Sequence, residues 1–122
     1  KIQMKKLPKF LQARKKNAEL LTDLLSKSNL SLPIQRKHEK VNWYLYTVTS
    51  PKRNTLLKKH KKKGIGAASY YPIPVHKTPF YKSKTKLPIT EWAASKVLSL
   101  PIHPKVTTKN IEFISKSIFE IL

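Results

Sequence analysis

Apolar residues recur every three or four positions near the start of the chain, and this spacing predicts a long helix there. The helix is expected to begin at about Leu7 and to continue to Leu25. Pro8 fits it either in its first turn or at a kink that follows a preceding helix. The polar stretch 26–40 is then predicted to be a connection. The apolar stripe consists of Phe10, Leu11, Ala18, Leu21, Leu24 and Leu25, and the outward-facing residues are Lys15, Lys16, Glu19 and Asp23.

A strand and a second helix are predicted in the middle of the chain. Residues 41–49 are rich in β-branched and aromatic side chains, which favour strands. Ser50 can cap a helix over 51–63, and Gly64 suits the left-handed position just beyond its end. Pro51 fits the first turn of this helix. Its apolar face consists of Leu56 and Leu57.

The next segment is predicted to be an open loop that leads into a short helix. Residues 65–71 are expected to be extended. Pro72 and Pro74 stiffen the chain and hold it open as a loop as far as residue 86. Thr90 can cap a short helix that runs to Val97.

The chain is predicted to end with a strand and a helix. Residues 98–100 form a brief apolar run that Pro101 ends, and Thr107 or Thr108 begins the last helix. This order of elements implies an α+β fold in which helices pack on a short, mainly antiparallel sheet. A chain of 122 residues has room for one core, so we expect a single domain over 1–122. The buried face of the last helix consists of Ile111, Ile114, Ile118 and Ile121.

Composition narrows the classes of protein to which the chain can belong. A hydrophobic content of 39% is too high for a disordered basic tail. The chain has no cysteine, which excludes a disulfide scaffold, a thiolate nucleophile and a cysteine-ligated metal site. No apolar run is long enough to span a bilayer, and the lysine-rich start lacks the apolar stretch of a signal peptide. We therefore expect a soluble cytoplasmic protein without a membrane partner.

The charge of the chain leaves two interpretations open. Lysine and arginine number 26 against 6 acidic residues, which gives a formal charge of +20. The lysines can simply coat a solvated surface. Alternatively, the run KKHKKK at 58–63 with Lys82, Lys84 and Lys86 can bind the phosphates of nucleic acid non-specifically, as a stand-alone basic binding module. No known nucleic-acid-binding motif accompanies these lysines.

No catalytic, cofactor-binding or metal-binding residue is predicted within the chain itself. Its four histidines lack ligand spacing, and Gly64 and Gly66 do not make a phosphate cradle. A catalytic lysine needs a desolvated pocket that lowers its pKa, whereas the lysines of 58–63 are expected to be solvated. His38 and His60 lie among lysines and are expected at the surface. The acids are scattered without a catalytic pair: Glu19, Asp23, Glu39, Glu91, Glu112 and Glu120.

Three stretches of the chain together form a specific pattern: QMKKLPKFLQARKKNAELL, KKGIGAASYYPIPVH and VLSLPIHPKVTTKNIEFI. The first contains Arg14, Asn17 and Ala18, the second has YPIPVH at 71–76, and the third has LSLP at 98–101. In this order and spacing they resemble the C-terminal third of the DegT/DnrJ/StrS-type sugar aminotransferases. The resemblance covers nearly the whole chain. It implies the small C-terminal domain of the aspartate-aminotransferase fold, fold type I.

The resemblance also implies an activity and a set of partners. Such enzymes are homodimers that move an amino group from an amino acid onto a keto group of a nucleotide-linked sugar. Their cofactor is pyridoxal phosphate, which a lysine of the large N-terminal domain holds. The chain is therefore expected to be inactive alone, with the large domain as its partner. Its exposed contact surface would favour self-association. A truncated or split gene product that pairs with a separately encoded large domain is a further alternative.

The YPIPVH loop supplies the predicted substrate-binding residues. Two prolines fix an extended backbone that can hold the His76 imidazole and the Tyr71 phenol toward a cleft. The resemblance implies that this loop faces the active site, so His76, and after it Tyr71, are predicted to contact the substrate or the other domain. The alternative is that His76 is an exposed loop residue without a role. His103 is expected to be structural or exposed, and Tyr44 stands where many family members have a histidine.

Overall fold

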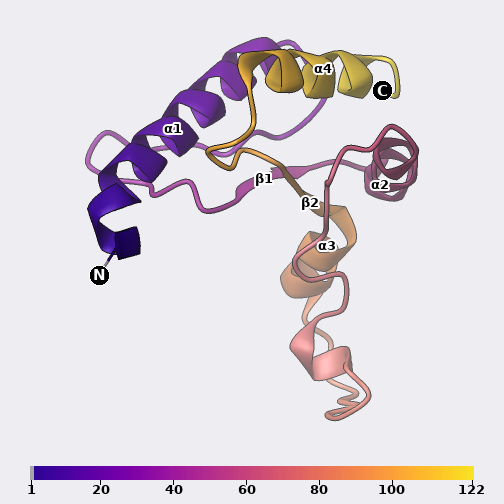
Figure 1. The fold of residues 1–122 in the computed structure, drawn as a ribbon. Coiled ribbons are helices and arrows are strands. Elements are labelled where there is room, and N and C mark those ends of the chain that lie inside the picture. Colours follow the sequence, from indigo (N-terminus) through magenta and orange to yellow (C-terminus); the bar gives the residue numbers. More distant parts are fainter. Residues whose placement is uncertain (1) are drawn as a thin grey trace.

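The computed structural model describes residues 2–122 and confirms the α+β class. Within these residues, four α-helices and a short 3-10 helix accompany one two-stranded antiparallel sheet (Figure 1). The described residues hold no helix long and apolar enough to cross a membrane. In chain order the elements are α1 (Ile2–Leu25), β1 (Tyr46–Thr49), α2 (Arg53–Lys62), η1 (Val75–Lys77), α3 (Pro88–Lys96), β2 (Val97–Leu100) and α4 (Thr108–Phe119).

The sheet is short but is extended at both edges by single bridges. Tyr46 of β1 pairs with Leu100 of β2, and the Thr47 and Ser99 hydroxyls share a hydrogen bond of 2.9 Å. Isolated antiparallel bridges join Ser31 to Thr49 and Ala68 to Ser99. The two edges therefore pair with the backbone of neighbouring loops, which satisfies N–H and C=O groups that an open edge would leave exposed.

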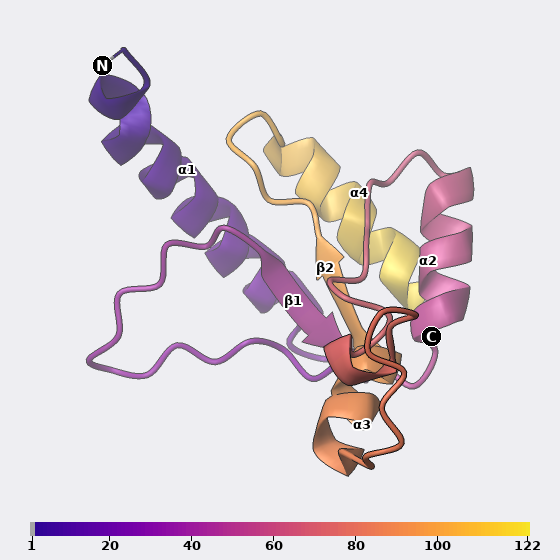
Figure 2. The same cartoon turned by 90° about the horizontal axis from the view of Figure 1, so that it is seen from below.

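The core lies where α1 and α4 pack together on the sheet (Figures 1 and 2). The amphipathic spacing of both helices brings apolar side chains of each into this layer, as the sequence predicts, but Phe10 and Leu11 of the predicted α1 stripe lie outside the core. Tyr46 is fully buried, and its hydroxyl makes a 2.8 Å hydrogen bond with that of Thr22 on α1. The main core residues are Ala18, Leu21, Leu25, Tyr46, Val48, Leu98, Leu100, Ile111, Ile114 and Ile118.

Residues 70–96, which we call the arm, extend away from this core (Figure 1). The arm contains η1 and α3, and α3 leads directly into β2. Ala94 is its buried hydrophobic residue, whereas Phe80 is 87% exposed. Because apolar burial contributes little here, polar contacts within the arm must hold its shape.

The first half of α1 also projects from the body (Figure 2). The buried residues of α1 begin at Asn17, and the apolar side chains of Ile2, Met4 and Leu7 are exposed. The helix begins at Ile2, so the predicted start near Leu7 is wrong, whereas the alternative with helix on the N-terminal side of Pro8 is confirmed. A proline removes one backbone hydrogen bond, and the good helix formers on either side of Pro8 can offset that loss.

Several predicted boundaries shift by a few residues. Of the predicted strand 41–49, only the last four residues pair, because the chain turns at Trp43, where φ is +50°. Ser50 does not cap α2, which begins at Arg53; its hydroxyl accepts a 3.1 Å bond from the Lys52 N–H instead. Of the segment 65–71, expected to be extended, Ala68 makes an isolated bridge.

Of three residues predicted to mark helix ends in the second half of the chain, Gly64 and Thr107 are confirmed and Thr90 is not. Gly64 has φ of +71°, as predicted for the position after α2. Thr90 is not a cap, because α3 starts earlier with Pro88 in its first turn. Thr107 does cap α4, in a reciprocal capping box with Asn110.

Candidate functional site

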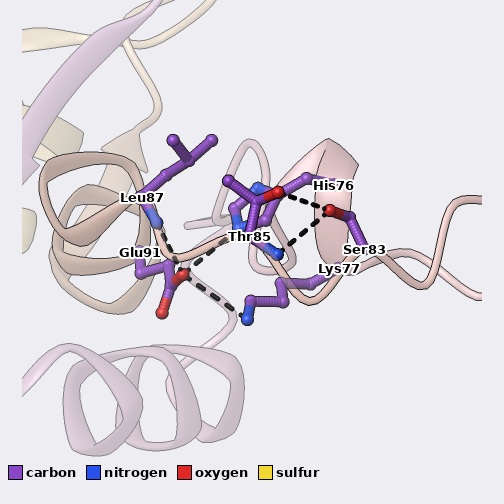
Figure 3. A network of polar contacts seen from close by, with 6 residues as sticks. All are labelled: His76, Lys77, Ser83, Thr85, Leu87 and Glu91. Carbon is purple, nitrogen blue, oxygen red and sulfur yellow. Dashed lines mark hydrogen bonds and ion pairs between the residues drawn. The ribbon is translucent and has the colours of Figure 1, made fainter.

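The Glu91 carboxylate fixes the arm through three contacts (Figure 3). Its Oε1 accepts a 3.1 Å hydrogen bond from the Leu87 N–H, and it lies 3.2 Å from His76 Nε2. Lys77 Nζ is 3.6 Å from the same oxygen. The bond from Leu87 is the main cause that lowers the pKa of Glu91, followed by the bond with His76. A single carboxylate thus joins η1 to the start of α3.

A second set of hydrogen bonds closes the loop between these elements (Figure 3). The Ser83 N–H donates to the His76 carbonyl at 2.9 Å. The Ser83 hydroxyl donates to the Thr85 hydroxyl and accepts from the Thr85 N–H. Local side-chain bonds of this kind stabilise turns where no core is available. The arm is therefore a folded unit held by polar contacts.

The two predicted substrate residues have different neighbours. The His76 ring points at Glu91, and only 13% of its side chain is exposed. Tyr71 is 76% exposed, and its ring meets that of Tyr70 edge-to-face at 6.0 Å. The Tyr71 side chain is therefore exposed to a ligand, whereas the His76 side chain holds the loop in place through its contact with Glu91.

Two polar residues on α1 hold a second pair of loops. Asn17 Nδ2 lies 3.3, 3.3 and 3.1 Å from the carbonyl oxygens of Ile102, His103 and Val106. Arg14, one turn earlier, donates to the Tyr44 carbonyl at 2.8 Å and to that of Trp43 at 3.3 Å. Its guanidinium also lies 5.5 Å from the centre of the Tyr44 ring, a cation–π distance.

Two adjoining hollows lie between these loops, and we call them together the Arg14 cleft. They measure about 450 and 220 Å³ and share Arg14, Tyr44 and His103. Leu7, Phe10 and Leu11 form an apolar wall of the larger one, and Tyr70 reaches the smaller one. No acidic residue lines either hollow. The combination of apolar wall, aromatic ring and positive charge suits binding of an anionic ligand or partner.

Arg14 and Asn17 are part of the sequence pattern that resembles the family, but their contacts in the fold were not predicted from it. The available signal was their position, because both fall on the apolar stripe of α1, where a polar residue needs a buried partner. His103, expected to be structural or exposed, is exposed and lines both hollows of the cleft. The expectation that His60 is at the surface is wrong: it is fully buried on α2.

The described residues do not fit a pyridoxal phosphate site. A Schiff-base lysine requires a dry pocket that favours its neutral form. No lysine within 2–122 is buried, and both glycines are surface residues with free space around them. The same residues bring no three histidine, aspartate or glutamate side chains together as metal ligands.

Comparison with known proteins finds one aminotransferase family that matches nearly the whole chain. The DegT/DnrJ/EryC1/StrS aminotransferase family matches residues 1–119. A Geobacillus stearothermophilus protein described as a pleiotropic regulatory protein is 31% identical over 93% of this chain and 32% of its own length. The dTDP-3-amino-3,4,6-trideoxy-alpha-D-glucose transaminase of Streptomyces venezuelae is 35% identical over 71% of this chain and 24% of its own.

A solved structure confirms the fold. The crystal structure of DesV from S. venezuelae, in complex with a ketimine intermediate, is 27% identical with a TM-score of 0.90. It covers 98% of this chain, which in turn covers 33% of that protein. The chain thus spans about a third of the length of the relatives it matches.

Proposed function

The chain belongs to the DegT/DnrJ/EryC1/StrS aminotransferase family, and we propose that it is the C-terminal small domain of an aminotransferase that acts on nucleotide-linked keto sugars. The observation that carries this proposal is a family match over 1–119 by a chain only a third as long as its relatives. The sugar-transaminase activity of the S. venezuelae relative supports the substrate class. The intact protein is a cytoplasmic homodimer in this proposal.

The role of this domain is to shape one side of the substrate cleft. Tyr71 offers an exposed phenol to the substrate, and His76 holds the loop in place through Glu91. The Arg14 cleft adds positive charge without an acid, which suits a nucleotide diphosphate group. In this proposal Tyr71, His76 and Arg14 bind or position the substrate, and none of them takes part in breaking a bond.

Catalysis belongs to the large domain in this proposal. Pyridoxal phosphate supplies the electron sink for amino transfer, and the described residues of this chain lack a fitting site for it. The start of α1 exposes three large apolar side chains, Ile2, Met4 and Leu7, and this is where we place the contact with the large domain. Alone, the chain is inactive and covers these side chains by self-association. The comparisons do not support the alternative of a stand-alone nucleic-acid-binding module.

The test is an amino-transfer assay on the intact protein that contains this chain, with glutamate as donor and nucleotide-linked keto sugars as acceptors. We expect an amino sugar, detected by mass spectrometry. Tyr71→Phe should raise KM for the sugar several-fold and change kcat little, because it removes one binding hydrogen bond, about 1 kcal/mol.

Tyr81→Phe is the matched control, since Tyr81 is an exposed tyrosine of the same arm outside the motif. It should leave KM unchanged. Absence of amino transfer to every nucleotide-linked keto sugar would contradict the proposed function. Equal effects of the two substitutions would contradict only the role of Tyr71.

A further inference from the structure

The outer side of α2 carries four lysines that form no ion pair within residues 2–122: Lys58, Lys59, Lys61 and Lys62. We call them the lysine face. All four are exposed, and α2 contains no acidic residue. Lys63, just past the helix, pairs with Glu120 of the C-terminal segment. The lysine face therefore lacks a counter-charge of its own.

The sequence around α2 does not neutralise this charge either. Between Glu39 and Glu91 the chain has twelve lysines and arginines and no acid. On the helix itself, Lys58 has like-charged neighbours three and four residues away, an arrangement that destabilises a helix. A bound anion would relieve this repulsion, so the composition of the face favours an anionic partner over bare solvent.

The surroundings of the lysines exclude two kinds of partner. The exposed large hydrophobic residues lie elsewhere on the chain and none is on α2, whereas protein interfaces need apolar or aromatic anchors. A membrane-bound amphipathic helix presents an apolar face to the lipid. The apolar side of α2 is instead turned into the core, where Leu56 and His60 are fully buried.

The kind of anionic partner that remains is a phosphate polymer. The one arginine of α2, Arg53, is occupied by the Ala94 and Ser95 carbonyls, so the face offers lysine point charges and no bidentate fork for bases. A helix of ten residues is about 15 Å long. Duplex DNA carries one negative charge per ~1.7 Å of its axis, so several phosphates lie within reach.

We propose that the lysine face of α2 binds the phosphate backbone of double-stranded nucleic acid without sequence preference. The face has no exposed aromatic side chain on which unpaired bases could stack, which favours a duplex over a single strand. This property is separate from amino transfer and does not depend on it.

Direct titration of the chain with a labelled mixed-sequence DNA duplex tests the proposal. The chain has its own buried core, and circular dichroism checks that each variant folds. The test variant combines Lys58→Gln, Lys59→Gln and Lys62→Gln. The control combines Lys5→Gln, Lys6→Gln and Lys9→Gln, three exposed lysines with the same spacing on α1. Both variants lose three charges from one exposed helix surface.

The expected result is a selective loss in the α2 variant. Its plot of log affinity against log salt should flatten by about 0.9 for each lysine lost, about 2.7 in total, and its affinity should fall roughly 500-fold near 0.1 M salt. The control should lose only a few-fold. Replacing the same three α2 lysines with arginine should keep the slope, because the charge is retained.

Three results would overturn the proposal. Equal losses in the α2 and α1 variants would mean that the general charge of +20, and no particular face, attracts DNA. Tighter binding to a single strand of the same length would contradict the duplex assignment. Equal or tighter binding to poly-glutamate or to anionic phospholipid vesicles, measured in parallel, would show that nucleic acid is not the preferred partner of the lysine face.

Discussion

Replacing Asn17 tests how α1 positions the turn that carries His103. The Asn17 side chain is only 8% exposed, and its amide donates into a cluster of three carbonyl oxygens. The amide has two hydrogens and so makes two good bonds at a time. Asn17→Leu removes both, at a net cost of about 1 kcal/mol each, or about 2 kcal/mol in total.

Asn17→Asp should cost more, and in a pH-dependent way. A carboxylate has no hydrogen to donate and would face the same carbonyls as a buried, unpaired charge, a cost of about 3–5 kcal/mol at pH 7. This is a large share of the roughly 5–15 kcal/mol that stabilises a typical domain. The protonated acid can donate one bond, so the folded state should raise the pKa of this carboxyl above its ordinary value of about 3.9.

The sign of the pH effect follows from that shift. The folded state binds the proton more tightly than the unfolded state does, so stability is highest below the unfolded pKa and falls as pH rises through the folded pKa. Between these two values the Asn17→Asp variant should lose about 1.4 kcal/mol per pH unit relative to Asn17→Leu.

Equilibrium urea unfolding at several pH values, followed by circular dichroism, measures these free energies. Asn54→Asp is the control, because Asn54 is exposed in the first turn of α2, where a negative charge is neutral to slightly stabilising. An Asn17→Asp variant as stable at neutral pH as Asn17→Leu would refute the reasoning. So would a difference between the two that does not change with pH.

Three further predictions concern other parts of the chain. His60→Leu should retain or raise stability at neutral pH, because both ring nitrogens of His60 are buried without hydrogen-bond partners. Burial lowers the pKa of His60, so the wild type, unlike the variant, should lose stability in urea unfolding as the pH falls below 6.5. Glu91→Gln should speed hydrogen exchange at the Leu87 amide, which donates to the Glu91 carboxylate, and leave exchange at the β1 amides unchanged. In the wild type, exchange at the Leu87 amide should likewise become faster relative to the β1 amides as the pH falls from 4.5 through the lowered pKa of Glu91. Thr107→Ala should cost about 1 kcal/mol in thermal or urea unfolding, and Thr108→Ala little, because Thr107 alone caps α4.

The regular parts of the fold could be predicted from periodicity and cap residues. The face of α4, with Ile111, Ile114 and Ile118, is buried as its spacing predicts, and Thr107 caps it. Gly64 takes the left-handed conformation expected after a helix. These features depend on residues close in sequence, so one sequence is enough to predict them.

The irregular parts depend on contacts between residues far apart in the chain. Trp43 turns the backbone out of the predicted strand where Arg14, 29 residues earlier, holds its carbonyl. The orientation of His76 follows from Glu91, 15 residues away, which the sequence shows only as a scattered acid. His60 is buried although its neighbours are lysines, because the apolar side of α2 faces the core and position 60 lies one turn after Leu56.

The most direct test of the central claim is to mix the purified chain with pyridoxal phosphate, record the visible spectrum, reduce with borohydride and measure the mass. Assigning the cofactor lysine to the large domain predicts no characteristic band and no stoichiometric adduct on this chain. A defined absorption band with one specifically modified lysine would contradict that assignment and place the cofactor site within these 122 residues.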